Sequence, residues 1–300
     1  MSNKEIFLNN VPAGDNVKIS LMVMRVIFKD TSKIVAILAD KSGEIKATIP
    51  TKKGDITEGR VIVVEGKKDN NFDVKKYEFL EEYEIEDYLP TVKRPIEDIM
   101  EELELYTDEY VISREGKALN DYFFKNEEFL ERFKKAIGGV SMHHNYIGGL
   151  AEHTLGVMYL TTVFCEKYNC KNKEIAVLSA KLHDIGKIYE MKYDGPFKYT
   201  LQGEMEGHIV IGISMLEKAF DSRENFYSDE FKARVKGCIV QHHGKLEFGS
   251  PKDMNMEEAY IVHFADYVDA TMNKIEKLKD KFPDGGWTEY DRKLETRLYL

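Results

Sequence analysis

All eight histidines of this 300-residue chain lie between His143 and His263. They are interspersed with acidic residues, and one histidine is followed directly by an aspartate. Imidazole and carboxylate groups are the side chains that hold zinc, iron and manganese in proteins. The sequence therefore predicts a divalent-metal site in the second half of the chain. The ligand candidates are His153, His183, Asp184, His208, His242, His243 and Asp266.

These candidates are distributed over several predicted helices. A single histidine is more often a core or surface residue than a ligand, but a series with candidates on each successive helix favours a metal site. Gly186 is a natural helix terminator and places the pair His183-Asp184 at a helix end. Five segments space their apolar residues by three and four, as helices do: residues 147–168, 173–189, 207–220, 229–243 and 256–281.

The N-terminal part of the chain has a different pattern. Five short segments rich in β-branched and apolar residues predict strands at residues 17–28, 34–39, 44–49, 59–66 and 73–79. Five strands in so short a stretch favour a small Greek-key barrel of the OB type, and another small barrel or a sandwich is the alternative. We therefore expect a two-domain α+β protein with an N-terminal barrel and an all-α domain.

Charge and sequence breaks support this division. Prolines at positions 90 and 95 follow the last strand, so the predicted domains are residues 1–88 and 126–300, joined by a helical linker at 89–125. The net charge of −10 argues against a chain that coats duplex nucleic acid. Residues 1–80 nevertheless hold 14 Lys and Arg against 11 Asp and Glu, a net of +3. The barrel is thus the mildly basic part.

Three cysteines without paired spacing fit reduced thiols, so a cytoplasmic protein is expected. No segment approaches the roughly 18 apolar residues that a membrane-spanning helix needs, and no membrane partner is expected.

At the ligand candidates the sequence resembles the HD superfamily of metal-dependent phosphohydrolases, whose signature is His…His-Asp…Asp. His208 and either His242 or His243 fall where two-metal members of that superfamily carry additional ligands. The resemblance implies an HD domain that holds two divalent ions. The signature maps onto residues of three predicted helices: His153, His183-Asp184 and Asp266.

A finer resemblance, to the YhaM-type bacterial 3′→5′ exoribonucleases, covers nearly the whole chain. It is carried by the segments His143-His-Asn-Tyr-Ile-Gly-Gly-Leu-Ala-Glu-His153 and Gln241-His-His-Gly-Lys-Leu-Glu-Phe-Gly-Ser-Pro251, behind the N-terminal barrel. The resemblance implies hydrolysis of single-stranded RNA to nucleoside 5′-monophosphates, with single-stranded DNA as an open alternative. We expect Mn²⁺ to serve best, while Fe, Co, Ni and Zn also suit such ligands.

The resemblance also suggests roles for individual residues. Asp184 lies between histidine ligands and is the natural carboxylate to bridge two ions, which activate a shared water. Lys187 follows one helical turn later and either meets a substrate phosphate or faces solvent. His143 and His144 either bind substrate phosphate or brace the first helix of the site. His263, one turn before Asp266, is expected to support a ligand rather than to be one.

The barrel is expected to guide the strand through a basic groove with stacking aromatic rings. Phe28, Phe72 and Tyr77 are the candidates, although aromatic residues on barrel strands more often belong to the core. We also expect a homo-oligomer.

Two other functions remain open. One is an HD phosphohydrolase of small nucleotides or cyclic dinucleotides, with the barrel used for assembly or regulation. The Gly-Tyr-Pro signature that a cyclic-di-GMP hydrolase would carry after the His-Asp pair is absent from the sequence. The other is a non-catalytic nucleic-acid-binding protein with a structural metal site.

Overall fold

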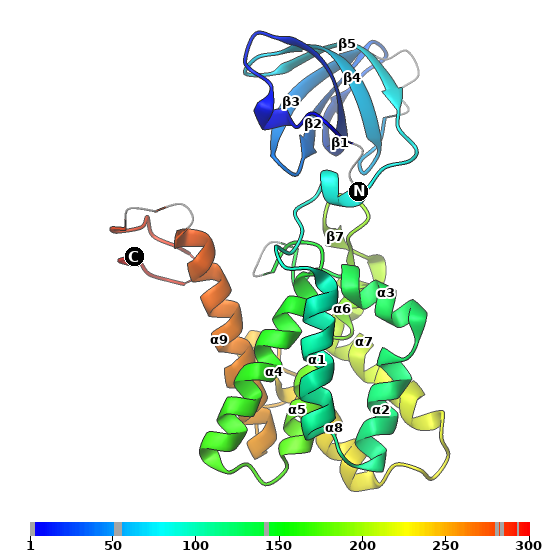
Figure 1. Ribbon diagram of the computed structural model, residues 1–300, viewed down its shortest axis with the longest axis vertical. Helices are drawn as coiled ribbons and strands as arrows, with labels where there is room; N and C mark the ends of the chain where they lie inside the picture. The colour runs from blue at the N-terminus through cyan, green and yellow to red at the C-terminus, as the bar shows by residue number, and fades with distance from the viewer. Residues whose placement is uncertain (1–3, 51–55, 141–143, 280–281, 283–284, 293) are drawn as a thin grey trace. The chain divides into compact units, whose positions relative to one another are not determined.

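The computed structural model describes residues 4–50, 56–140, 144–279, 282, 285–292 and 294–300. It divides into two compact units, which are described separately (Figure 1). The first comprises Met1–Thr91 with Lys192–Lys198, and the second comprises Val92–Met191 with Tyr199–Leu300. The region predicted as a helical linker, residues 89–125, therefore belongs mostly to the second unit.

The first unit is a closed five-stranded barrel with strand order β1-β2-β3-β5-β4, in which β4 pairs back to β1. All neighbours are antiparallel except β3 and β5, which pair in parallel. This order and closure confirm the predicted OB-type barrel. The strands are β1 (Asn16–Lys29), β2 (Lys33–Asp40), β3 (Gly43–Pro50), β4 (Val61–Lys68) and β5 (Phe72–Phe79).

The long first strand closes the barrel because it pairs on both sides. Its first half, from Asn16 to Met22, pairs with β4, and its second half, from Met22 to Lys29, pairs with β2. Two register shifts in the second half mark bulges, which bend a strand and increase its twist. Alternate side chains then point into one apolar core, as the period of two predicts.

The second unit is helical. Its helices are α1 (Ile96–Tyr110), α2 (Arg114–Phe124), α3 (Glu127–Lys135), α4 (Gly149–Tyr168), α5 (Lys173–Leu182), α6 (Lys187–Glu190), α7 (Leu201–Asp221), α8 (Asp229–Gln241) and α9 (Glu257–Lys279). A two-residue ribbon, β6 (Met191–Lys192) and β7 (Lys198–Tyr199), separates α6 from α7, and short 3-10 turns lie at Leu8–Asn10, Ile85–Asp87 and Leu246–Phe248.

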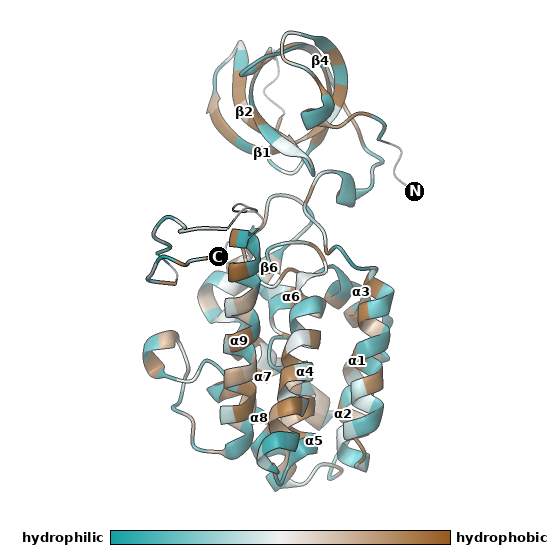
Figure 2. Ribbon diagram, turned by 60° about the vertical axis from the view of Figure 1, so that its left-hand side comes forward, coloured by the Kyte–Doolittle hydropathy of each residue, from teal (hydrophilic) through white to brown (hydrophobic). Residues whose placement is uncertain are grey.

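Helix α4 forms the centre of this unit and packs against α1, α3, α5 and α9. In Figure 2 it carries much of the hydrophobic colour, whereas α1 is mainly hydrophilic on its visible side. Helix α1 still contributes Ile99 and Leu103, both fully buried, to the core. For this reason α1 is an integral part of the helical unit rather than a linker.

Two predicted helices differ in detail from the observed ones. The segment expected at residues 173–189 is two helices, because the chain turns between His183 and Gly186. Helix α7 begins six residues before the predicted start, but Gly207 has φ 72° and ψ 158° and interrupts it. Both breaks lie beside ligand candidates, so they position the site.

Within the described residues, no helix is long and apolar enough to cross a membrane. The three cysteines are free and buried.

Candidate metal centre

Five helices bring the predicted ligands together around one carboxylate. Asp184 lies in the turn after α5 and is 3 % exposed. The other candidates come from α4, the end of α5, the kink in α7, the end of α8 and the middle of α9. The structure therefore gathers every candidate of the predicted ligand set, and the two oxygens of Asp184 face different members of it.

Oxygen Oδ2 of Asp184 faces the first ligand set. It lies 3.5 Å from Nε2 of His153 and 3.2 Å from Nε2 of His183. Oδ1 of Asp266 completes this set, 3.2 Å from Nε2 of His153. Two ligands at about 2.0–2.2 Å from a common ion lie this far apart, so the set could hold one divalent ion.

Oxygen Oδ1 of Asp184 faces the second ligand set. It lies 3.5 Å from Nε2 of His208 and 3.7 Å from Nε2 of His242. Nε2 of His243 lies 3.2 Å from Nε2 of His208. Both neighbours in the pair at 242–243 thus enter the set, and the choice between them that the sequence left open does not arise.

Three of the five histidine rings are oriented by backbone carbonyl groups. A carbonyl oxygen only accepts hydrogen bonds, so the ring nitrogen that faces it carries the proton. In a neutral ring, Nε2 then presents its lone pair to the centre. The bonds run from Nδ1 of His183 to the Ala180 oxygen (2.8 Å), of His242 to the Ile239 oxygen (2.7 Å) and of His243 to the Phe248 oxygen (3.1 Å).

Carboxylates orient the other two rings. Nδ1 of His153 lies 2.7 Å from Oδ2 of Asp269, and Nδ1 of His208 lies 3.1 Å from Oε1 of Glu190. Such carboxylate–histidine pairs hold a metal ligand in position and make it more basic. Neither acid was predicted from the sequence. The spacing of Asp269, one turn after Asp266, could have indicated the first, but no comparable signal exists for Glu190.

A helical glycine makes room for one of these carboxylates. A Cβ atom at Gly156 on α4 would lie 2.0 Å from Oδ1 of Asp269. Only a residue without a side chain therefore allows Asp269 on α9 to reach His153.

The donor set fits cations better than internal hydrogen bonds. Oδ1 of Asp184 is buried without a hydrogen-bond partner among the described residues, which is costly for a carboxylate. The Nε2 atoms of His153 and His183 lie 3.3 Å apart. Those of His208 and His243 lie 3.2 Å apart. In neutral rings whose proton is on Nδ1, the two Nε2 lone pairs of each contact face one another, and a cation between them would bind both.

The surroundings of the ligand histidines also determine their protonation states. Burial, together with the neighbouring His243 and His183 rings, holds the pKa of His242 well below its usual range, so this ring is in the neutral, ligating form. Burial also disfavours the charged form of His153, but the three carboxylates around it outweigh burial and raise its pKa. A divalent ion would compete with that proton for the ring.

Lys187 is buried and does not face solvent, which removes one of the two predicted alternatives. Its Nζ lies 2.6 Å from Oδ2 of Asp184 and donates to the Gly138 oxygen at 2.8 Å. Burial alone would raise the pKa of Asp184 and lower that of Lys187. Instead His183 and the Lys187 ammonium hold the pKa of Asp184 well below its usual range, and Asp184 raises that of Lys187.

His144 and His263 contact residues of the site without belonging to either ligand set. The buried ring of His144 has Nε2 3.6 Å from Asp269 and 3.9 Å from Glu152. These contacts fit the bracing alternative, whereas the predicted phosphate contact stays a prediction, since the ring also borders a pocket. His263 hydrogen-bonds through Nδ1 to the His242 oxygen at 2.7 Å, a supporting contact as expected. His143 lies outside the described residues.

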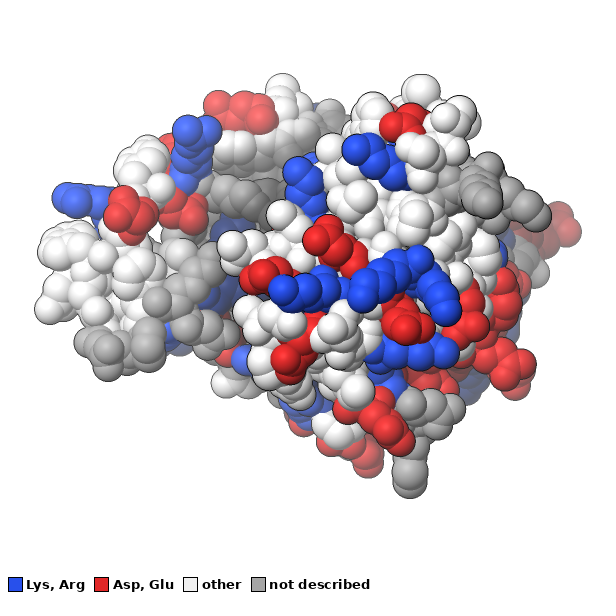
Figure 3. All heavy atoms as spheres, turned by 90° about the horizontal axis from the view of Figure 1, so that it is seen from above, with Lys and Arg blue, Asp and Glu red and all other residues white. Residues whose placement is uncertain are grey.

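The barrel only partly matches the predicted stacking surface. Phe72 is fully buried in the barrel core, so the prediction that it stacks on a base is wrong. Tyr77 is half-buried and packs edge to face against Phe79. Phe28 is 49 % exposed and presents a ring to solvent. On the face seen in Figure 3, blue basic side chains alternate with red acidic ones instead of forming one continuous basic surface.

Comparisons with known proteins agree with this geometry. Residues 150–271 match the HD domain family, a segment that includes every metal-ligand candidate. The chain is 28% identical to the 3′-5′ exoribonuclease YhaM of Geobacillus sp. (strain WCH70), over 95% of this chain and 92% of the relative. It is 28% identical to YhaM of Bacillus subtilis (strain 168), over 73% and 68%. It is 27% identical to YhaM of Bacillus velezensis, over 89% and 87%.

The HD domain match covers the ligand-bearing helices, and the similarity to the YhaM proteins extends across both units. Residues 150–271 are therefore an HD domain, and the chain as a whole is similar to the YhaM-type proteins.

Proposed function

We propose that this protein is a metal-dependent 3′→5′ exoribonuclease that hydrolyses single-stranded RNA to nucleoside 5′-monophosphates. The relatives that resemble it over both units are named as 3′-5′ exoribonucleases. The observation that carries the proposal is the Asp184 carboxylate, whose two oxygens face two separate sets of ligands. Sites that hold two divalent ions on a shared carboxylate suit hydrolysis of phosphodiesters.

Each ligand set would hold one ion, and Mn²⁺ is the ion we propose because imidazole and carboxylate ligands accept it readily. When bound, two such ions supply an activated water and neutralise the non-bridging oxygens of the phosphate.

The protein's own side chains hold the histidine ligands in position and balance the charge at the site. The rings of His153 and His208 are fixed by carboxylates, so their Nε2 atoms need little rearrangement to bind an ion. Lys187 offsets the charge of Asp184 and uses two of its three N–H donors on Asp184 and Gly138. The third donor remains for a phosphate oxygen, which is the role we propose for Lys187.

The barrel is proposed to bind the strand without contributing to the chemistry. The exposed ring of Phe28 offers a surface for base stacking, and the net charge of +3 in residues 1–80 favours a polyanion. A cytoplasmic homo-oligomer remains our prediction. Three free cysteines fit a reducing compartment, and light scattering would measure the subunit number.

An oligoribonucleotide labelled at its 5′ end tests this function. We expect shortening from the 3′ end, release of nucleoside 5′-monophosphates, loss of activity in a chelator and recovery with Mn²⁺. The same oligonucleotide in DNA measures the sugar preference. Early release of the labelled nucleotide would contradict the polarity. Hydrolysis of small or cyclic nucleotides without shortening of RNA would favour the alternative phosphohydrolase, and binding without hydrolysis would favour the non-catalytic one.

A further inference from the structure

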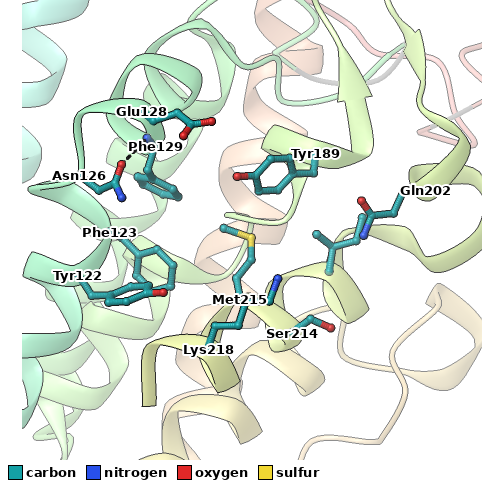
Figure 4. Close-up of a pocket in the computed structure, with 11 residues that line it drawn as sticks. Tyr122, Phe123, Asn126, Glu128, Phe129, Tyr189, Gln202, Ser214, Met215 and Lys218 are labelled. Atoms are coloured by element: carbon teal, nitrogen blue, oxygen red, sulfur yellow. Dashed lines mark hydrogen bonds between the residues drawn. The ribbon is translucent and has the colours of Figure 1, made fainter. Parts of the chain in front are cut away.

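The helical unit holds a second pocket, separate from the metal centre. It lies between α2, α3, α6 and α7 and has a volume of about 330 Å³ (Figure 4). Small-molecule sites in proteins occupy about 300–1,000 Å³, so this volume suits a small ligand. None of the metal-ligand candidates lines it.

Four aromatic side chains contribute to the wall of this pocket. Phe123 and Phe129 are buried, whereas Tyr122 and Tyr189 are 39 % and 38 % exposed. Figure 4 shows Tyr122 and Phe123 on one side of the space and Tyr189 on another, with the Met215 thioether between them. Partly exposed rings around a narrow space are suited to hold a planar ring by stacking.

Polar groups at the same pocket are available to a ligand. Oδ1 of Asn126 accepts from the N–H of Phe129 at 3.1 Å, which leaves the side-chain NH₂ group as a donor. Within the described part of the chain, the ammonium group of the exposed Lys218 makes no hydrogen bond or ion pair. An unpaired cation beside stacking rings is suited to a planar ring that carries an anionic group.

We propose that this pocket binds a nucleoside 5′-monophosphate, with its base among the aromatic side chains and its phosphate at Lys218. The choice of a nucleotide among planar anions rests on the proposed function, whose product is such a nucleotide. The pocket is also joined to the metal centre through α6. Tyr189 directly precedes Glu190, which anchors His208, so a bound nucleotide would contact the segment that orients the second ligand set.

Titration calorimetry with AMP tests the pocket on the full-length protein, both loaded with Mn²⁺ and in EDTA. We expect AMP to bind in EDTA as well, because the pocket contains no metal ligand. Tyr122→Ala and Lys218→Ala should each weaken binding about tenfold or more, as loss of a stacking ring or phosphate contact does. Both side chains are exposed, so the fold should persist. Ribose 5-phosphate, which lacks a base, should bind much more weakly than AMP.

Matched controls are Tyr168→Ala and Lys167→Ala, two exposed residues at the end of α4 that should leave AMP binding unchanged. No AMP binding at millimolar concentrations, binding lost in EDTA, or binding insensitive to both pocket variants would overturn the inference. RNA hydrolysis is measured in parallel. Hydrolysis without AMP binding in the pocket refutes only this site, whereas AMP binding in the pocket without hydrolysis refutes only the proposed function.

Discussion

Asp184 is a side chain on which both ligand sets depend, because each of its oxygens belongs to a different set. The six other candidates each belong to one set only. A single change at this residue therefore tests the two-ion proposal more directly than a change at any one histidine.

We predict that Asp184→Asn abolishes hydrolysis while the protein stays folded. Loss of the bridging charge should lower kcat by at least about 10²–10³-fold, the scale of losing one strong electrostatic contact. The amount of bound metal should fall below about two equivalents per protein chain. Circular dichroism, metal analysis and the RNA assay measure these changes. Retention of most of the activity would contradict a mechanism based on two ions.

The two carboxylates that hold the histidine rings permit a selective test. Asp269→Asn should lower the affinity of the first set for its ion, and Glu190→Gln that of the second set. Each change should lower the affinity by about 10–100-fold, because supporting carboxylates contribute this much to metal affinity. Metal titration followed by calorimetry distinguishes the two sites. Glu276→Gln, at an exposed position on α9, is the control and should bind both ions normally.

At the scale of helices, two glycines determine how the turn after α5 packs on α7. A Cβ atom at Gly186 would lie 2.0 Å from the His208 oxygen, so the turn after α5 can pack closely on α7. At Gly207 the backbone takes a conformation that is open essentially to glycine alone. This kink lets both the backbone N–H and the ring of His208 meet Oε1 of Glu190, at 3.0 Å and 3.1 Å.

We predict that Gly207→Ala lowers the free energy of unfolding by about 1–3 kcal/mol, because the kink becomes strained. The affinity of the second ligand set for its ion should also fall. The matched control on the same helix is Gly212→Ala. A Cβ there would meet atoms at 3.7 Å or more, and alanine favours a helix interior by up to about 1 kcal/mol. Urea denaturation and metal titration measure both variants. Equal stability of the two variants would show that α7 does not need its kink.

At the scale of the whole molecule, the two units divide binding from chemistry in our proposal. All ligand candidates lie in the helical unit, and the basic excess lies in residues 1–80. The division has to be tested at the observed boundary near Val92. A cut inside α1 would remove Ile99 and Leu103 from the core.

We predict that residues 92–300 alone still hydrolyse a short or artificial phosphodiester but act poorly on long RNA. Their RNA binding should also depend less on salt, because fewer phosphate contacts release counterions. Activity on oligonucleotides of increasing length and at several salt concentrations measures this, with circular dichroism to verify the fold. Equal activity of both proteins on long RNA would exclude the barrel from substrate handling and favour the small-nucleotide alternative.

Local pattern was enough to predict the barrel, most helices and the residues that gather around Asp184. Strand alternation and helical spacing are properties of neighbouring residues, and metal ligation depends on residue type. The His-Asp pair beside Gly186 could thus be placed at a helix end without any structure. The helix limits differ from the predicted ones, since the kink at Gly207 and the turn after His183 lie where that turn and α6 pack on α7.

The sequence by itself determined which residues could bind metal and which segments carry them. Only the tertiary structure decided that Asp269 reaches His153 across 116 residues, that both His242 and His243 enter one set, and that Phe72 is buried. These outcomes depend on contacts between distant segments, and close approaches such as that at Gly156 are set by the packed helices together. Residue spacing along one chain carries no direct record of such contacts.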